Sequence, residues 1–247
     1  MKRIGTLVHL SAAAVFVTAG LTYAWQTAAT TGPDSLGATA SLLSMPLAPP
    51  PSIPQFYLDP GNVVMWSLLI AVWAMVLLDA VGQWIDPSDT DPVRTGRPRI
   101  WPLAVLALAL GATWPMLIQS PGLLTLSAGI SAAAAILAAR RAAGRHRPAI
   151  GFFAGWATAL CSAALAAMGA ERFGLSMQSV SAIAILPSAL IGMAAQIWIG
   201  PSIGYSTAMI WAFCGLAIST MGSDPVIALA AILGISAMAA VLVRAAS

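Results

Sequence analysis

The stretch Asn62–Trp84, NVVMWSLLIAVWAMVLLDAVGQW, decides the fold class of this chain. Its apolar residues lie on all sides of a helix rather than on one face, and Asp79 is its only charged residue. An α-helix needs about 20 consecutive apolar residues to cross the hydrocarbon core of a bilayer. The stretch therefore predicts a transmembrane helix.

The composition extends this prediction to the whole chain. Of 247 residues, 59% are hydrophobic and only 8% are charged. A soluble domain carries roughly a quarter charged residues on its surface. A transmembrane barrel would alternate apolar and polar residues over segments of about 10 residues, which is not the pattern here. We expect an integral membrane protein, most simply in the inner membrane of a bacterium.

Seven further apolar blocks accompany Asn62–Trp84. They run over Ile4–Trp25, Trp101–Gln119, Leu123–Ala139, Ala149–Met168, Ser179–Ile199, Ile203–Met221 and from Pro225 to Arg244. Together they predict an all-α, polytopic transmembrane bundle of about eight helices. The first block also resembles a signal peptide, but no clear A-x-A cleavage motif follows it, so we expect it to be retained.

The basic residues fix the expected orientation. If the N-terminus is cytoplasmic, ten of the 11 lysines and arginines fall on the inside and only Arg172 falls on the outside. Cytoplasmic loops carry an excess of lysine and arginine. The blocks follow from hydropathy alone, so the distribution of the basic residues is independent support for eight spans with both termini inside. The inside residues are Lys2, Arg3, Arg94, Arg97, Arg99, Arg140, Arg141, Arg145, Arg147 and Arg244.

The longest stretch without an expected helix is Gln26–Pro60, which is rich in Thr, Ser, Pro and Gly. Pro49, Pro50 and Pro51 follow one another there. Proline lacks a backbone donor and disfavours helix in the residue before it. A loop of this length is usually disordered or a functional lid.

Few residues suggest catalysis. The chain has no G-x-S-x-G, H-E-x-x-H or Gly-rich phosphate motif, so we expect neither an enzyme nor a bound cofactor or metal. Cys161 and Cys214 lie in apolar blocks and are read as packing residues. For His9 and His146 we expect a packed and a solvated side chain, with a haem held by both as the minor alternative.

Asp79 is the only acidic residue well inside an apolar block. An intramembrane carboxylate is a functional hypothesis by default. It lies near the predicted cytoplasmic end of its helix, where it could reach interfacial water or pair with an arginine of the next loop. We therefore favour a structural role for Asp79.

Tryptophan is the remaining signal. Of nine tryptophans, Trp66, Trp73, Trp114, Trp156 and Trp211 fall inside the predicted spans. Trp66 and Trp73 are seven residues apart and share one helix face. Buried tryptophans suit a cavity for a flat apolar ligand, because each offers a large surface and one N–H donor. Composition alone favours ordinary helix packing and interfacial belts.

Three stretches resemble the TspO/MBR family, the tryptophan-rich sensory proteins related to the peripheral benzodiazepine receptor. They are Asp59–Trp66, Gly111-Ala112-Thr113-Trp114 and Phe153-Ala154-Gly155-Trp156-Ala157-Thr158-Ala159. They resemble a proline–tryptophan start of the second helix, an N-x-x-W motif in the third, and an aromatic-x-G-W-x-x-x-A signature in the fifth. The chain departs from these patterns at Ile70, Gly111 and Phe153, where the family has tyrosine, asparagine and tyrosine.

The resemblance covers residues 1–170, with the long loop 26–60 inside it, and makes residues 171–247 a three-helix extension. It implies a compact five-helix core that binds porphyrins, sterol-like lipids and aromatic drugs in a tryptophan-lined cavity covered by the first loop. By position, the ligand-binding residues would be Trp66, Trp73, Trp114, Phe153 and Trp156, with Tyr57 and Phe56 in the lid. The loss of polar partners favours a more hydrophobic ligand.

Three functions follow from these observations. The first is a sensor or carrier that binds a tetrapyrrole, sterol or lipid. The second is a structural or assembly subunit of a larger membrane complex, suggested by the helices rich in Ala and Gly. The third is a membrane enzyme that acts on a lipid or pigment, for which Asp79 is the only visible acid–base group. The expected partners are membrane lipids, a small hydrophobic ligand and a second copy or complex subunit, but no nucleic acid.

Overall fold

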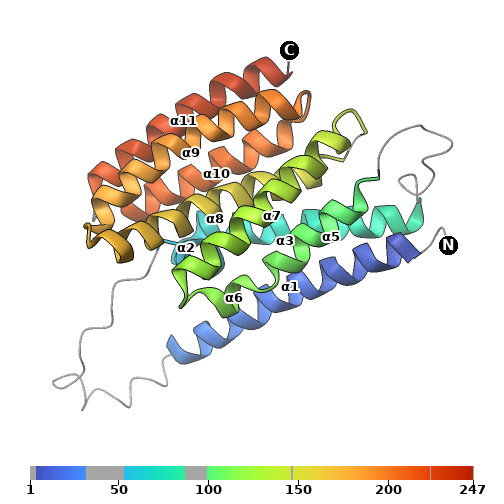
Figure 1. The fold of residues 1–247 in the computed structure, drawn as a ribbon, viewed down its shortest axis with the longest axis horizontal. Coiled ribbons are helices and arrows are strands. Elements are labelled where there is room, and N and C mark those ends of the chain that lie inside the picture. Colours follow the sequence, from blue (N-terminus) through green and yellow to red (C-terminus); the bar gives the residue numbers. More distant parts are fainter. Residues whose placement is uncertain (1–3, 32–52, 87–98, 146, 223, 247) are drawn as a thin grey trace.

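A computed structural model describes residues 4–31, 53–86, 99–145, 147–222 and 224–246. All regular secondary structure in these ranges is helical, and the long helices lie side by side in one bundle (Figure 1). The helices are α1 (Ile4–Thr31), α2 (Gln55–Leu58), α3 (Val63–Ile85), α5 (Trp101–Gly111), α6 (Trp114–Leu117), α7 (Pro121–Ala142), α8 (Pro148–Phe173), α9 (Met177–Ile199), α10 (Ile203–Thr220) and α11 (Pro225–Ala246).

Within the described part of the chain, six helices are long and apolar enough to cross a membrane: α1, α3, α7, α8, α10 and α11. Trp101–Gly111 and Ile185–Ile199 are shorter apolar stretches. The expected all-helical membrane bundle is therefore confirmed. Eight crossings and cytoplasmic termini stay predictions.

Two local expectations were wrong. Two parts of the stretch Gln26–Pro60, which was expected to hold no helix, are helical: Gln26–Thr31 extends α1, and Gln55–Leu58 forms α2. The third block is not one helix, because α5 ends at Gly111 and α6 begins at Trp114. Pro115 accounts for the break, since it has no N–H to donate to the carbonyl of Gly111 and is tolerated only in the first turn of the next helix. The Thr113 hydroxyl donates to the Leu110 carbonyl at 2.7 Å and satisfies part of the interrupted ladder.

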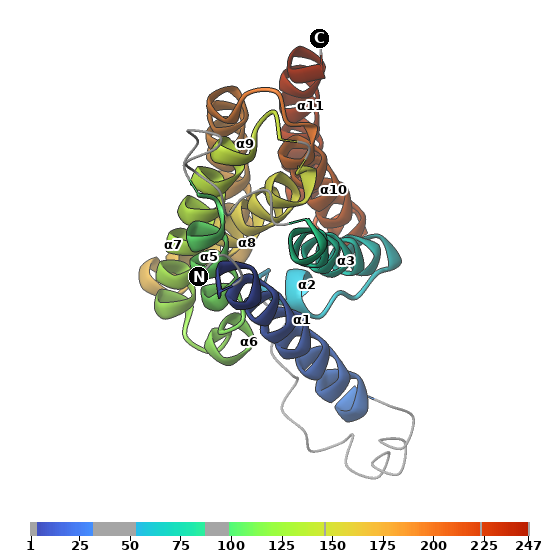
Figure 2. The ribbon, with the colours of Figure 1, turned by 90° about the vertical axis from the view of Figure 1, so that its right-hand side faces the viewer.

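Five long segments close into a ring. Neighbours pack in the order α1, α3, α8, α7, α5 and back to α1. Helices α9, α10 and α11 lie on the far side of α8 (Figure 2), where α9 and α10 pack on α8 and α11 packs on both of them. Every residue from Ala149 to Leu160 of α8 is buried. The helix therefore forms a wall shared by the ring and by the last three helices.

Glycine brings α8 and α10 unusually close. A Cβ atom added to Gly155 would lie 2.4 Å from the carbonyl oxygen of Tyr205, and one added to Gly204 would lie 2.4 Å from that of Pro148. Small residues allow this approach between membrane helices, where dispersion contacts replace the hydrophobic driving force. The glycine of the Phe153–Ala159 stretch thus serves the contact with α10.

Asn62 confirms the predicted start of the second spanning helix and joins it to α10. Its Oδ1 accepts a hydrogen bond from the backbone N–H of Met65 at 2.9 Å, and its Nδ2 donates to the hydroxyl of Ser219. The first bond caps α3, because it satisfies one of the four N–H groups left free at a helix start.

We expect Asn62→Ala to lower the free energy of unfolding by about 1 kcal/mol, as the loss of an N-cap usually does. Asn62→Asp keeps the capping oxygen and loses only the donor to Ser219, so its stability should lie closer to wild type. Helicity followed through denaturation in mixed micelles measures both. Equal stability of Asn62→Ala and wild type would contradict the capping role.

Candidate functional site

Four aromatic rings meet inside the five-helix ring: Phe16 of α1, Trp114 of α6, and Phe153 and Trp156 of α8. The centroids of Trp114 and Trp156 lie 5.2 Å apart with their planes at 39°. Phe16 meets Phe153 edge to face at 5.4 Å and Trp156 at 5.8 Å. Such geometries add about 0.5–1.5 kcal/mol per pair beyond buried area. We call these four residues the aromatic cluster.

The backbone explains how the cluster forms. A Cβ atom on Gly111 would lie 3.1 Å from the ring of Phe16 and 3.7 Å from that of Phe153. Gly111 therefore makes room for both phenylalanines at the end of α5. The break that follows it starts α6 at Trp114, whose side chain is completely buried.

Both indoles of the cluster carry an unusual N–H group. The Nε1 atoms of Trp114 and Trp156 are buried and donate to no acceptor among the residues that the structure describes. Most buried polar groups in proteins have a partner, and leaving one without a partner costs about 1–3 kcal/mol. By contrast, the Nε1 of Trp211 donates to the carbonyl of Val64 at 3.1 Å. The aromatic cluster thus contains two contacting indoles whose buried donors have no partner in the described part of the chain.

The other candidates predicted from the sequence lie elsewhere. Trp73 packs its indole on Gly20 of α1, where an added Cβ would lie 2.8 Å from the ring. Trp66 is half-buried on α3. Neither makes a ring contact with the aromatic cluster in the described ranges. The structure thus brings together Trp114, Phe153 and Trp156, but not Trp66 or Trp73.

Tyr57 and Phe56 belong to α2, which packs on α1 and α3 within the connection between them (Figure 2). The side chain of Tyr57 is buried, and burial raises the pKa of its hydroxyl group. Phe56 is partly buried against the same core. Of the loop expected to form a lid, α2 is docked on these two helices, and residues 32–52 lie outside the described residues.

Phe16 was missed by the sequence reasoning. It lies in the first block, outside all three stretches that resemble the family, and only the packing of α1 against α5 and α8 reveals it. Phe16 shares a buried helix face with Ala13 and Val17, but the first block is apolar around the helix, so its sequence does not single this face out.

A second group of polar side chains lies near the start of α8. The Nε of Arg147 donates to Asp79 Oδ1 at 2.9 Å and its second nitrogen, Nη2, donates to Oδ2 at 2.6 Å. His9 Nε2 lies 3.7 Å from the same Oδ2. All three side chains are buried. We call them the charged triad.

The partner of Asp79 differs from the expectation of an arginine in the next loop. Arg94 and Arg97 of that loop lie outside the described residues, and Arg147 comes instead from the start of α8. The reason is that α3 packs on α8, which places the two side chains at one level. A two-point Arg–carboxylate pair is the strongest common form of salt bridge.

His9 and Asp79 of the charged triad border a void of about 10 Å³, which Phe153 of the aromatic cluster also lines. It has room for about one water molecule. Among the described residues no group of three or more His, Cys, Asp or Glu could hold a metal ion. His146, the second histidine of the haem alternative, lies outside the described residues. A buried ion pair that holds α3 to α8 is the structural role that the sequence favoured for Asp79.

Further arginines gather at the same end of the bundle as the charged triad. Arg140 stacks on the ring of Trp198 at 4.2 Å and donates to its carbonyl oxygen. Arg141 donates to the carbonyl oxygen of Arg99 at 2.9 Å. The grouping agrees with the charge asymmetry that set the predicted orientation.

Comparison of the chain with protein-family models, with curated proteins and with solved structures gives no match. The fold and the site define the protein as an all-helical membrane bundle with a buried aromatic cluster. The resemblance to the TspO/MBR family stays a prediction that depends on the three stretches of sequence.

Proposed function

We propose that the protein is a TspO-type sensor or carrier that binds a flat hydrophobic ligand, a tetrapyrrole or a sterol-like lipid, at the aromatic cluster. The observation that carries this proposal is the pair of buried indole N–H groups of Trp114 and Trp156, which have no acceptor among the described residues and belong to rings whose centroids lie 5.2 Å apart. A ligand that offers acceptor oxygens to these donors would remove their desolvation cost.

The surrounding residues restrict the chemistry of this ligand. The rings of Phe16, Phe153 and the two indoles offer stacking and edge contacts, and Gly111 beside them supplies no polar side chain. The ligand would therefore be held by aromatic contacts and by one oxygen acceptor, such as a carboxylate, carbonyl or hydroxyl group. A strongly polar solute would find no further partner there.

Two features offer a route to the aromatic cluster. The helix break at Ala112–Thr113 separates short α6 from α5, and broken helices frame the binding sites of many membrane transporters. Because the four rings touch one another, a ligand must displace at least one of them. A four-residue helix such as α6 has few contacts of its own, so it can shift at lower cost than a full span.

The test is quenching of tryptophan fluorescence in the purified protein by protoporphyrin IX and by cholesterol. We expect saturable quenching by one of them. Trp156→Phe keeps an aromatic ring and removes one donor, so it should weaken affinity about fivefold to tenfold, the value of one hydrogen bond. Trp156→Ala would leave a cavity costing about 3–5 kcal/mol and is the poorer variant.

Trp211→Phe is the matched control. Its indole N–H already donates within the protein and lies outside the aromatic cluster, so ligand affinity should equal that of wild type. Equal affinities of Trp156→Phe and Trp211→Phe would refute the proposed site. If neither protoporphyrin IX nor cholesterol quenches the fluorescence saturably, ligand binding of this kind is refuted and a structural subunit is favoured.

A further inference from the structure

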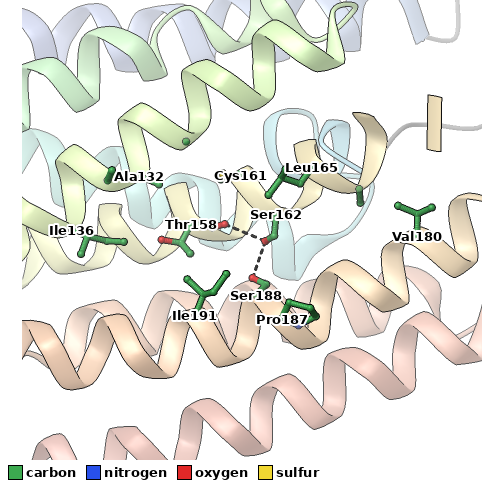
Figure 3. Close-up of a pocket in the computed structure, with 13 residues that line it drawn as sticks. Ala132, Ile136, Thr158, Cys161, Ser162, Leu165, Val180, Pro187, Ser188 and Ile191 are labelled. Atoms are coloured by element: carbon green, nitrogen blue, oxygen red, sulfur yellow. Dashed lines mark hydrogen bonds between the residues drawn. The ribbon is translucent and has the colours of Figure 1, made fainter. Parts of the chain in front are cut away.

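A second hollow lies between α7, α8 and α9, apart from both the aromatic cluster and the charged triad (Figure 3). Its volume is about 430 Å³. This is within the roughly 300–1,000 Å³ of small-molecule sites. Most of the lining is apolar, and the side chains labelled in Figure 3 include Ile136, Leu165, Val180, Pro187 and Ile191.

The space arises from small residues and a proline. Gly129, Ala132 and Ala133 of α7 and Ala166 of α8 line it, so these helices present little volume to α9. Pro187 lies inside α9 and removes one backbone hydrogen bond from that helix. Because α7 and α8 are candidate membrane spans, the cavity lies at a depth where hydrocarbon, and not water, surrounds the protein.

The polar part of the lining is a short relay of hydroxyl groups. Ser188 Oγ donates to Ser162 Oγ at 2.8 Å, and Ser162 Oγ donates to the carbonyl oxygen of Thr158 at 3.1 Å (Figure 3). The relay therefore ends on a backbone acceptor, and its hydrogens all point into the protein. The oxygen of Ser188, at the start of the relay, keeps acceptor capacity toward the cavity.

This polarity selects among ligands. A group that donates a hydrogen bond gains a partner at Ser188, while a pure alkane gains none. A carboxylate or an ammonium group would be buried without a counter-ion, which is costly inside a membrane. The site thus suits a long apolar molecule with a single hydroxyl group.

We propose that this cavity binds a long-chain alcohol-type lipid from the bilayer, with its hydroxyl group donating to Ser188 Oγ and its hydrocarbon chain against Ile136, Leu165 and Ile191. The proposal is independent of ligand binding at the aromatic cluster. It names a second, differently shaped site on the other face of α8.

The probe is hexadecanol that carries a diazirine on its chain, added to the full-length protein in phosphatidylcholine nanodiscs. After irradiation, mass spectrometry should find label on peptides of α7, α8 and α9. Unlabelled hexadecanol and hexadecane should both compete with the probe. Hexadecanol should suppress the labelling at a concentration about fivefold lower than hexadecane, because its hydroxyl group adds one hydrogen bond. In Ser188→Ala the two competitors should become equivalent.

Two tryptophan variants provide the steric test. Ile136→Trp fills the cavity and should abolish the saturable labelling. Leu137→Trp, on the neighbouring exposed face of α7, should leave it unchanged and controls for the added ring. Labelling that survives Ile136→Trp, or equal competition by hexadecanol and hexadecane in wild type, would overturn the proposal. The labelling experiment and the fluorescence quenching by porphyrin or cholesterol use different readouts. A negative result in one therefore does not imply a negative result in the other.

Discussion

Replacing Asp79 with alanine should lower the free energy of unfolding by about 3–5 kcal/mol, the usual cost of removing one partner of a buried ion pair. The guanidinium of Arg147 would remain buried beside His9 without the carboxylate that accepts two of its hydrogen bonds. A charge kept from water costs more than the pair itself contributes. The loss of stability should appear in denaturation in mixed micelles, followed by helicity.

A double-mutant cycle separates the pair from its single members. Arg147→Met should also destabilise the protein strongly, because it leaves the carboxylate. The double variant Asp79→Ala/Arg147→Met should be more stable than the sum of the two losses indicates, since it leaves neither charge buried. Asp86→Ala, at the exposed end of the same helix, should change stability by no more than about 0.5 kcal/mol. Additive losses in the cycle would show that the two residues act separately.

Replacing Gly155 with alanine should be the second severe change, although it adds a single methyl group. The new Cβ would lie 2.4 Å from the carbonyl oxygen of Tyr205 and 2.9 Å from the Cβ of Ala208. Neither atom can rotate away, so α8 and α10 must move apart. Overpacking of this kind typically costs about 1–3 kcal/mol, and we expect the upper end because backbone is involved.

Gly82→Ala is the matched control for Gly155→Ala. An added Cβ at Gly82 meets nothing within 4 Å. Alanine also has the higher helix propensity, by about 1 kcal/mol. Gly82→Ala should therefore equal or exceed wild type in thermal stability. If Gly155→Ala and Gly82→Ala have the same melting temperature, the close contact between α8 and α10 does not contribute to stability.

The sequence predicted most of the helices because hydropathy and length are local properties. The stretch Asn62–Trp84 was predicted as a helix, and the structure has α3 begin directly after Asn62, which caps it. Proline was harder to interpret. Pro115 accompanies a break between α5 and α6, whereas α9 continues through Pro187. The same residue type therefore has two outcomes, and the surrounding packing, which no local pattern records, decides between them.

The candidate site was predicted in part. Trp114, Phe153 and Trp156 could be grouped because each falls in a recognisable stretch, and the structure does bring their rings together. Phe16 and the pairing of Asp79 with Arg147 depend on which helices are neighbours. Which helices become neighbours in a bundle depends on how their entire surfaces pack together. The sequence of one apolar block does not reveal this.

The position of α8 also has a consequence for biosynthesis. The ring of α1, α3, α5, α7 and α8 can close as soon as α8 has left the ribosome, since all its members are then present. The glycine-lined face of α8 nevertheless stays exposed to lipid until α10 has been synthesised and inserted. During that interval Gly151 and Gly155 form an uncovered helix-packing surface on the nascent protein. Another small-residue helix could pair there first, so correct assembly depends on the prompt arrival of the last three helices.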